Sequence, residues 1–165
     1  MTSRTTLVLL GLAFSLGLGG AEPQEFTGVW KLNMQRSTMK DGGPLTLNKS
    51  HVISIVLKGS VFQWSEQRIS SDGTFFSSFA EVDPSGNEAK LIDFRNGRVN
   101  DDGRSTVAVT ANGLEYKFRG SDGPGKEFSG TRKLVLAPGG KTMVAEFEAN
   151  RYGELVAWTE VWERY

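Results

Sequence analysis

The sequence predicts an all-β protein: an antiparallel up-and-down meander of roughly 8–10 strands closed into a barrel. Three observations support this fold class. Short segments rich in β-branched and aromatic residues follow one another along the chain, as strands do. Turns rich in Gly, Asn, Asp and Pro separate these segments, and no stretch has a sustained helical period. Short turns between successive strands indicate a meander, which closes into a barrel or folds as a sandwich.

The first 21 residues have the pattern of a secretory signal peptide. Arg4 supplies a basic start, an apolar run follows over 7–18, and the small residues of 19–21 form an A-x-A-like cleavage site. The apolar run is shorter than the roughly 20 residues that a membrane-spanning helix needs. We therefore expect cleavage after Ala21, export to the periplasm or the extracellular space, and no stable membrane insertion.

Residues 22–165 are expected to form a single domain, since their number suits one fold with a sizeable core. The chain contains no Cys, so its stability must come from the core and not from disulfide bonds. Among exported proteins, the absence of disulfide bonds is more typical of bacteria than of eukaryotes. Loss of Arg4 would leave the mature chain with one net negative charge. Such a chain has no basic field that would attract nucleic acid or anionic lipid.

The predicted strands follow in order from Gly28. The first contains Gly28, Val29 and Trp30, and the long connection 33–50 comes after it. We expect this connection to form a lid or a short helix over an open end of the barrel. The remaining strands are expected at 51–58, 61–69, 74–82, 89–94, 105–110, 114–120, 126–136, 142–149 and 155–165. Asn112-Gly113 gives the clearest turn between them, because this dipeptide favours a two-residue hairpin.

Gly28-Val29-Trp30 opens the first strand, and Arg164 lies near the end of the last. This pattern resembles the calycin superfamily, which contains the lipocalins and the fatty-acid-binding proteins. The resemblance implies that Gly28 and Trp30 open the barrel and that Arg164 packs over the indole to close one end. The segments "GVWKLN" and "SGTRKLVLAPGGKTM" are also similar to a set of exported bacterial lipocalin-like proteins. The resemblance implies no catalytic residues.

Few residues suit nucleophilic or metal chemistry. His51 is the only His, and neither a Cys nor a G-x-S-x-G elbow is present, so we interpret His51 as a structural imidazole at a strand start rather than part of a Ser-His-Asp site. One His and no Cys exclude the usual zinc sets. Arg98 stands where a calcium loop would place its first acidic ligand before Asp101 and Asp102. We therefore expect a solvated hairpin at 100–105, no metal and no cofactor.

Alternation along two strands gives the candidate binding residues. If Arg164 points inward, the residues of the same parity on the last strand do too, and the strand 61–69 repeats the pattern. The predicted ligand-binding residues are Phe62, Trp64, Glu66, Arg68, Trp158, Glu160 and Trp162. Apolar walls with a few convergent polar groups are typical of a small-molecule pocket; a filled core with outward charges is the alternative. A buried Glu160 needs a cationic partner or a raised pKa, and Arg68 and Arg132 are the candidate partners.

Three functions remain open at this point. The first is an exported, monomeric barrel that binds a small hydrophobic or amphipathic molecule. The second is a small barrel enzyme, an isomerase or hydrolase, with Glu160 or Glu66 as the acid–base. The third is an envelope interaction module with a packed core that recognises a protein through loops such as 33–50. The sequence favours binding over catalysis. A cavity would argue against the third function, and a raised carboxylate pKa inside it would favour the second.

Overall fold

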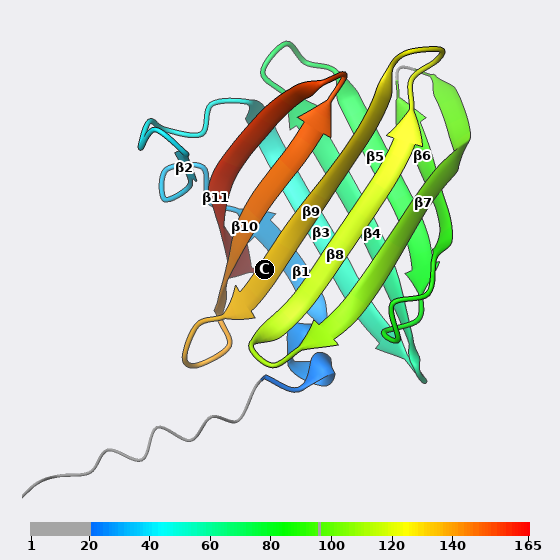
Figure 1. The fold of residues 1–165 in the computed structure, drawn as a ribbon. Helices are drawn as coiled ribbons and strands as arrows, with labels where there is room; N and C mark the ends of the chain where they lie inside the picture. The colour runs from blue at the N-terminus through cyan, green and yellow to red at the C-terminus, as the bar shows by residue number, and fades with distance from the viewer. Residues whose placement is uncertain (1–20, 96) are drawn as a thin grey trace, which may run out of the picture.

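A computed structural model describes residues 21–95 and 97–165 of the chain. The expected signal peptide falls, apart from Ala21, outside the described residues. Ten antiparallel strands form a meander that closes into a barrel (Figure 1), which confirms the predicted fold class. The elements are η1 (Pro23–Phe26), β1 (Gly28–Leu32), β2 (Thr38–Met39), β3 (Asn48–Lys58), β4 (Val61–Ser70), β5 (Phe75–Val82), β6 (Ala89–Arg95), β7 (Arg98–Thr110), β8 (Gly113–Ser121), β9 (Glu127–Leu136), β10 (Thr142–Arg151) and β11 (Glu154–Arg164).

The barrel closes through β1, which pairs with both β3 and β11. Trp30 lies opposite Ile53 on one side and opposite Arg164 on the other. Because the first and last strands are hydrogen-bonded neighbours, the sheet has no long free edge there. The architecture is compatible with a calycin-like fold.

The connection 33–50 differs from the expected lid or helix. It carries the short strand β2, in which Thr38 and Met39 pair with Thr159 and Trp158 of β11. β1 pairs with β11 only as far as Trp162, so β2 continues the wall along the remaining part of β11 (Figure 1). The prediction of a lid or helix is therefore wrong. The connection instead extends the barrel wall beside β11 beyond the point where β1 ends.

The expected hairpin at 100–105 is also absent, because β7 begins at Arg98. A β-bulge interrupts its pairing with β6: Asp93 lies opposite Asn100, whereas Leu91 lies opposite Gly103. The extra residue in β7 places Asp101 and Asp102 together at the bulge, where both are exposed. The acidic pair thus marks an irregular strand and not a loop.

The two ends of the barrel differ. η1 and the turns β3–β4, β5–β6, β7–β8 and β9–β10 lie at the lower end of the barrel in Figure 1, here called the closed end. The turns β4–β5, β8–β9 and β10–β11, together with the end of β6 and the start of β7, surround the upper end, here called the mouth. Phe26 of η1, Trp30, Phe62 and Trp162 are fully buried in the core.

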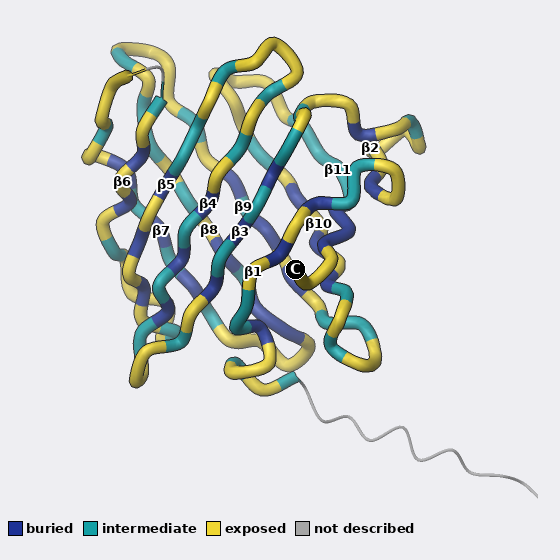
Figure 2. The backbone as a smooth tube through the Cα atoms, turned by 180° about the vertical axis from the view of Figure 1, so that it is seen from behind, coloured by how far each residue is buried: buried dark blue, intermediate teal, exposed yellow. Residues whose placement is uncertain are grey.

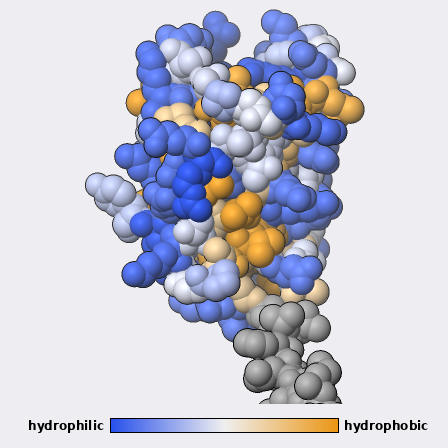
Figure 3. Space-filling model, turned by 90° about the vertical axis from the view of Figure 1, so that its left-hand side faces the viewer, coloured by the Kyte–Doolittle hydropathy of each residue, from blue (hydrophilic) through white to orange (hydrophobic). Residues whose placement is uncertain are grey.

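Buried and exposed residues alternate along most strands, as expected when one face of the sheet is interior (Figure 2). On the outer surface, hydrophobic side chains gather in small areas among a hydrophilic majority on the face shown in Figure 3. The described part of the chain contains no helix with the length and hydropathy of a membrane span.

Candidate functional site

A cavity of about 270 Å³ lies inside the barrel, close to the lower end of the ~300–1,000 Å³ typical of small-molecule sites. Its lining includes residues from both sides of the mouth, among them Leu47, Asn48 and Glu154. The cavity therefore occupies the mouth half of the barrel. Strand register divides its lining into two walls with different chemistry.

The wall formed by β3–β6 is polar. Register places Arg68, Phe76 and Arg95 in one row across β4, β5 and β6. Both guanidiniums lie over the Phe76 ring, Arg68 at 4.9 Å and Arg95 at 5.3 Å from its centroid. The next row toward the closed end contains Glu66 of β4, Ser78 of β5 and Asp93 of β6. All of these residues line the cavity.

The opposite wall, formed by β8–β11, is largely aromatic. Phe147 stacks on Trp158 with ring centroids 4.3 Å apart, and Phe118 lies 6.1 Å from Phe147. Two inward glycines make room for these rings. A Cβ at Gly130 would meet the Phe118 ring at 2.5 Å, and a Cβ at Gly120 would meet the Phe128 ring at 2.7 Å. The glycines therefore let the rings lie flat along the wall, where they present apolar surface to the cavity.

Glu66 is held by His51 and Arg132. His51 Nε2 lies 2.6 Å from one carboxylate oxygen, and Arg132 donates to the other at 3.3 Å. Burial raises the pKa of Glu66, but the nearby Arg132 and His51 lower it more strongly, so the net pKa is far below the usual range. Glu66 is therefore an ionised structural partner and a poor proton acceptor at neutral pH.

Glu160 completes the same network from β11. Arg132 donates to its carboxylate through Nε at 2.7 Å and through a second nitrogen at 3.4 Å. The indoles of Trp158 and Trp162 donate to it as well, at 3.0 and 3.1 Å. Burial lowers the pKa of Arg132, but Glu160 and Glu66 raise it above its ordinary value. The alternation argument correctly placed Glu160 inside, and of the two candidate partners the structure selects Arg132.

Two ionisable groups on the polar wall are left out of this network. Nε of Arg68 has no hydrogen-bond partner, and the guanidinium forms no ion pair within the described residues. Burial lowers the pKa of Arg68, with smaller contributions from the neighbouring arginines, although Glu66 raises it. Asp93 is 3% exposed, and burial raises its pKa. An isolated buried charge costs free energy, so both groups suit a ligand that would supply their partners.

The predicted ligand-binding residues fall into two sets. Glu66, Arg68 and Trp158 line the cavity. Phe62, Trp64 and Trp162 belong to the packed core, and Glu160 is buried in the ion network beside them. Pocket and filled core, which the sequence left as alternatives, therefore describe different halves of one barrel.

The three residues assigned to barrel closure lie together at the closed end. The Arg164 guanidinium is 4.6 Å from the Trp30 ring centroid, and the Trp30 indole donates to the Phe26 carbonyl at 2.9 Å. Gly28 has a φ of 153°, which side-chain-bearing residues rarely adopt, and a Cβ there would lie 3.6 Å from Arg164 Nε. Sequence reasoning missed the contribution of η1, whose Phe26 is fully buried beneath this contact.

Sequence reasoning also missed Asp93, Ser78, Phe147 and Arg95 as cavity residues. Asp93 sits two residues after the buried Leu91 in a segment that had been predicted as a strand, so strict alternation from Leu91 would have placed it inside. Ser78 and Phe147 alternate in the same way with Ala80 and Ala145. The signal was present in each strand, but nothing in the sequence indicated which rows would surround a cavity.

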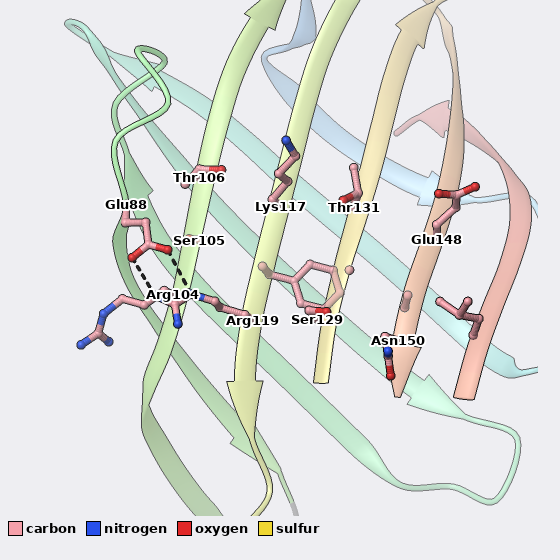
Figure 4. A pocket seen from close by; sticks show the side chains of 14 residues that line it. Glu88, Arg104, Ser105, Thr106, Lys117, Arg119, Ser129, Thr131, Glu148 and Asn150 are labelled. Atoms are coloured by element: carbon pink, nitrogen blue, oxygen red, sulfur yellow. Dashed lines mark hydrogen bonds and ion pairs between the residues drawn. The ribbon is translucent and has the colours of Figure 1, made fainter. Parts of the chain in front are cut away.

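A larger depression of about 390 Å³ lies on the outer face of β7–β11 (Figure 4). Most of its charged groups are exposed, and several have partners within the protein: Arg119 donates to Glu88 at 3.0 and 2.9 Å, and Lys117 pairs with Glu115. Solvated pairs of this kind contribute little and leave no group that requires a ligand. The interior cavity, which contains the buried unpaired groups, is therefore the stronger candidate despite its smaller volume.

Within the described residues, no group of three or more His, Cys, Asp or Glu side chains is arranged to hold a metal ion. The chain matches no protein-family model, and no curated protein matches it. The geometry of the cavity is therefore the basis for assigning a function.

Proposed function

We propose that the barrel binds, in its interior cavity, a small amphipathic molecule that carries an anionic group. The observation that carries this proposal is Arg68, a half-buried cation on the cavity wall with no ion-pair partner among the described residues. A ligand carboxylate or similar anion would replace the water that Arg68 loses on burial.

The surroundings of Arg68 support the choice of an anion. Arg95 lies in the same row, but it already donates to Asp122 at 2.7 Å. Arg132 is saturated by Glu66 and Glu160. Arg68 is therefore the guanidinium of the polar wall that forms neither an ion pair nor a hydrogen bond with the described residues. The positive potential of its arginine neighbours, which lowers the pKa of Arg68, would also attract an anion.

The aromatic wall supports a planar or apolar body for the ligand. Phe118, Phe147 and Trp158 offer ring faces and edges across the cavity from Arg68. Aromatic groups gain about 0.5–1.5 kcal/mol from such pairings beyond the burial of area. The small cavity favours a compact ring system over a long acyl chain.

Titration with naphthoate, followed by calorimetry, tests this proposal. We expect wild-type protein to bind naphthoate and Arg68→Met to bind it about tenfold more weakly or worse, since a charge-assisted contact is worth about 1.5–3 kcal/mol. Arg119→Met is the matched control, because it removes the same charge from the exposed outer face. Equal loss in both variants would mean that only net charge matters, and it would contradict the proposal.

The geometry argues against acid–base catalysis by Glu66 or Glu160. Both carboxylates are engaged by Arg132, and the pKa of Glu66 is lowered, the opposite of what a general acid needs. The packed-core interaction module is also disfavoured, because the mouth half contains a cavity. Binding is the function that the arrangement supports best.

We further propose that residues 1–21 direct export and that the mature chain begins at Glu22. The basic start, the apolar run and the small residues before the cleavage site support this proposal. N-terminal sequencing of exported protein tests it, and retention of residues 7–18 in that material would contradict it.

A further inference from the structure

Within the described residues, no donor contacts the carboxyl group of Asp93. It points inward from β6, lines the cavity and is 3% exposed. Its side chain forms no hydrogen bond or ion pair with the described residues. Glu66 and Glu160 differ sharply from it, because each has at least two donors on its carboxylate.

Two of the neighbours that could serve Asp93, Arg95 and Asn100, are engaged elsewhere. Arg95, the nearest cation on its own strand, donates to Asp122, which the Tyr152 hydroxyl also contacts. Asn100, opposite Asp93 on β7, donates to the Ser121 carbonyl at 2.7 Å. Burial raises the pKa of Asp93, Arg95 lowers it, and the acidic groups of Asp122 and Asp102 raise it further.

We infer that Asp93 determines ligand specificity: it accepts a hydrogen bond from a hydroxyl or amino group of the same small molecule whose anionic group pairs with Arg68. This inference rests on the proposed function. The ligand class it names is a small aromatic acid that carries a second, hydrogen-bond-donating substituent. Without that donor, the Asp93 carboxyl would be desolvated by the ligand and left unpaired.

Register shows that one small molecule can reach both groups. Arg68 lies on β4 and Asp93 on β6, with only β5 between them. Neighbouring strands are about 4.8 Å apart, so the two backbones are roughly 10 Å apart across the sheet. Asp93 lies one row deeper than Arg68, and the long Arg68 side chain shortens the gap. A fused ring system with an acid group on one side and a hydrogen-bond donor on the other would span the distance between Arg68 and Asp93. Its rings would then lie against the Phe147–Trp158 stack.

The test compares naphthoate with its hydroxy and amino derivatives, each substituted in turn around the distal ring. Calorimetric titration gives the affinity of each for wild-type protein, Asp93→Leu and Asp93→Asn. We expect at least one hydroxy or amino derivative to bind wild-type protein about tenfold more tightly than naphthoate. The two series show whether a hydroxyl or an amino group is preferred.

In Asp93→Leu the derivatives should bind no more tightly than naphthoate. Naphthoate itself should bind this variant at least as tightly as wild type, because it no longer desolvates an unpaired carboxyl group. Asp93→Asn keeps the size of the side chain, and its preference for the derivative over naphthoate should be at least about threefold smaller than that of wild type. This variant provides the test if Asp93→Leu does not fold. Glu81→Gln, on the exposed outer side of β5, is the control and should keep the preference in full.

The outcomes separate the inference from the proposed function. If naphthoate binds and Arg68→Met weakens it, but no derivative binds more tightly or both Asp93 variants keep the preference, the role of Asp93 is wrong and the proposed function stands. If no member of the set binds wild-type protein, both are wrong.

Discussion

At the closed end of the barrel, the indole of the fully buried Trp30 donates to Phe26 and Arg164 covers its ring. In the mouth half, Arg68 and Asp93 face the cavity without such partners among the described residues. A chain optimised for stability alone would pair or replace these two groups. Unpaired buried groups are a cost that proteins retain chiefly at functional sites. The difference indicates that one half stabilises the barrel and the other half binds.

The ion network of Arg132, Glu66 and Glu160 lies between these halves. It satisfies its own charges through close contacts from β3, β4, β9 and β11. It therefore acts as a polar floor that separates the filled core from the cavity. Variants at the closed end, in the floor and in the cavity should therefore have different effects.

The largest expected effect is at the closed end. Trp30→Ala should lower the free energy of unfolding by about 3–5 kcal/mol, as for other large buried aromatic side chains. Arg164→Ala should cost about 0.5–2 kcal/mol, the range for a cation over an indole. Chemical denaturation of both variants and of the double variant measures these values. Because the two side chains touch, the double loss should be smaller than the sum; full additivity would mean that their contact contributes nothing.

Disrupting the floor should cost nearly as much. Arg132→Met leaves Glu66 and Glu160 buried without their shared cation, and such a change typically costs about 3–5 kcal/mol. We expect reduced stability by denaturant unfolding, with stability partly recovered when Glu160→Gln is added. A stable Arg132→Met protein would show that the network carries little of the fold.

The floor should also make the protein sensitive to acid. The folded-state pKa of Glu66 lies below its unfolded value, so its contribution to stability is present above the ordinary Glu pKa of about 4.3 and is lost as the pH falls below it. The free energy of unfolding, measured from pH 7 downward, should fall less steeply in Glu66→Gln than in wild type. If the free energy of unfolding fell equally steeply with decreasing pH in the two proteins, this assignment would be contradicted.

The smallest expected effect has the opposite sign. The pKa of Asp93 is raised on folding, so its ionised form opposes folding above the unfolded carboxyl pKa and the opposition disappears at low pH. Asp93→Asn should therefore raise the thermal midpoint at pH 7 but not at pH 3. Glu146→Gln, an exposed site on β10, is the control and should change little at either pH. A lower midpoint for Asp93→Asn at pH 7 would mean that Asp93 has a stabilising partner.

Much of the fold was predictable because alternation is local. The strands 61–69 and 155–165 pair with β5 and β10 without a register shift, so one inward residue places the others of the same parity. Glu160 and Glu66 were placed inside for this reason. The start of β7 was missed because Asn100, Asp101 and Asp102 have low strand propensity and a bulge breaks the period.

The cavity was less predictable, because it depends on register between strands far apart in sequence. The pairing of Arg132 with Glu160 depends on neighbours from several strands, and so does the lack of a partner for Asp93 among residues 21–95 and 97–165. The two-residue strand β2 likewise exists only because β11 offers a free edge where β1 ends. Such relationships have no local sequence signature.

The most direct test of binding in the mouth half is a crystal structure of the protein with naphthoate. We expect one molecule in the interior cavity, its carboxylate within hydrogen-bond distance of the Arg68 guanidinium and its rings against Phe147 and Trp158. Naphthoate in the outer depression of Figure 4, or an interior molecule whose carboxylate points away from Arg68, would contradict the account.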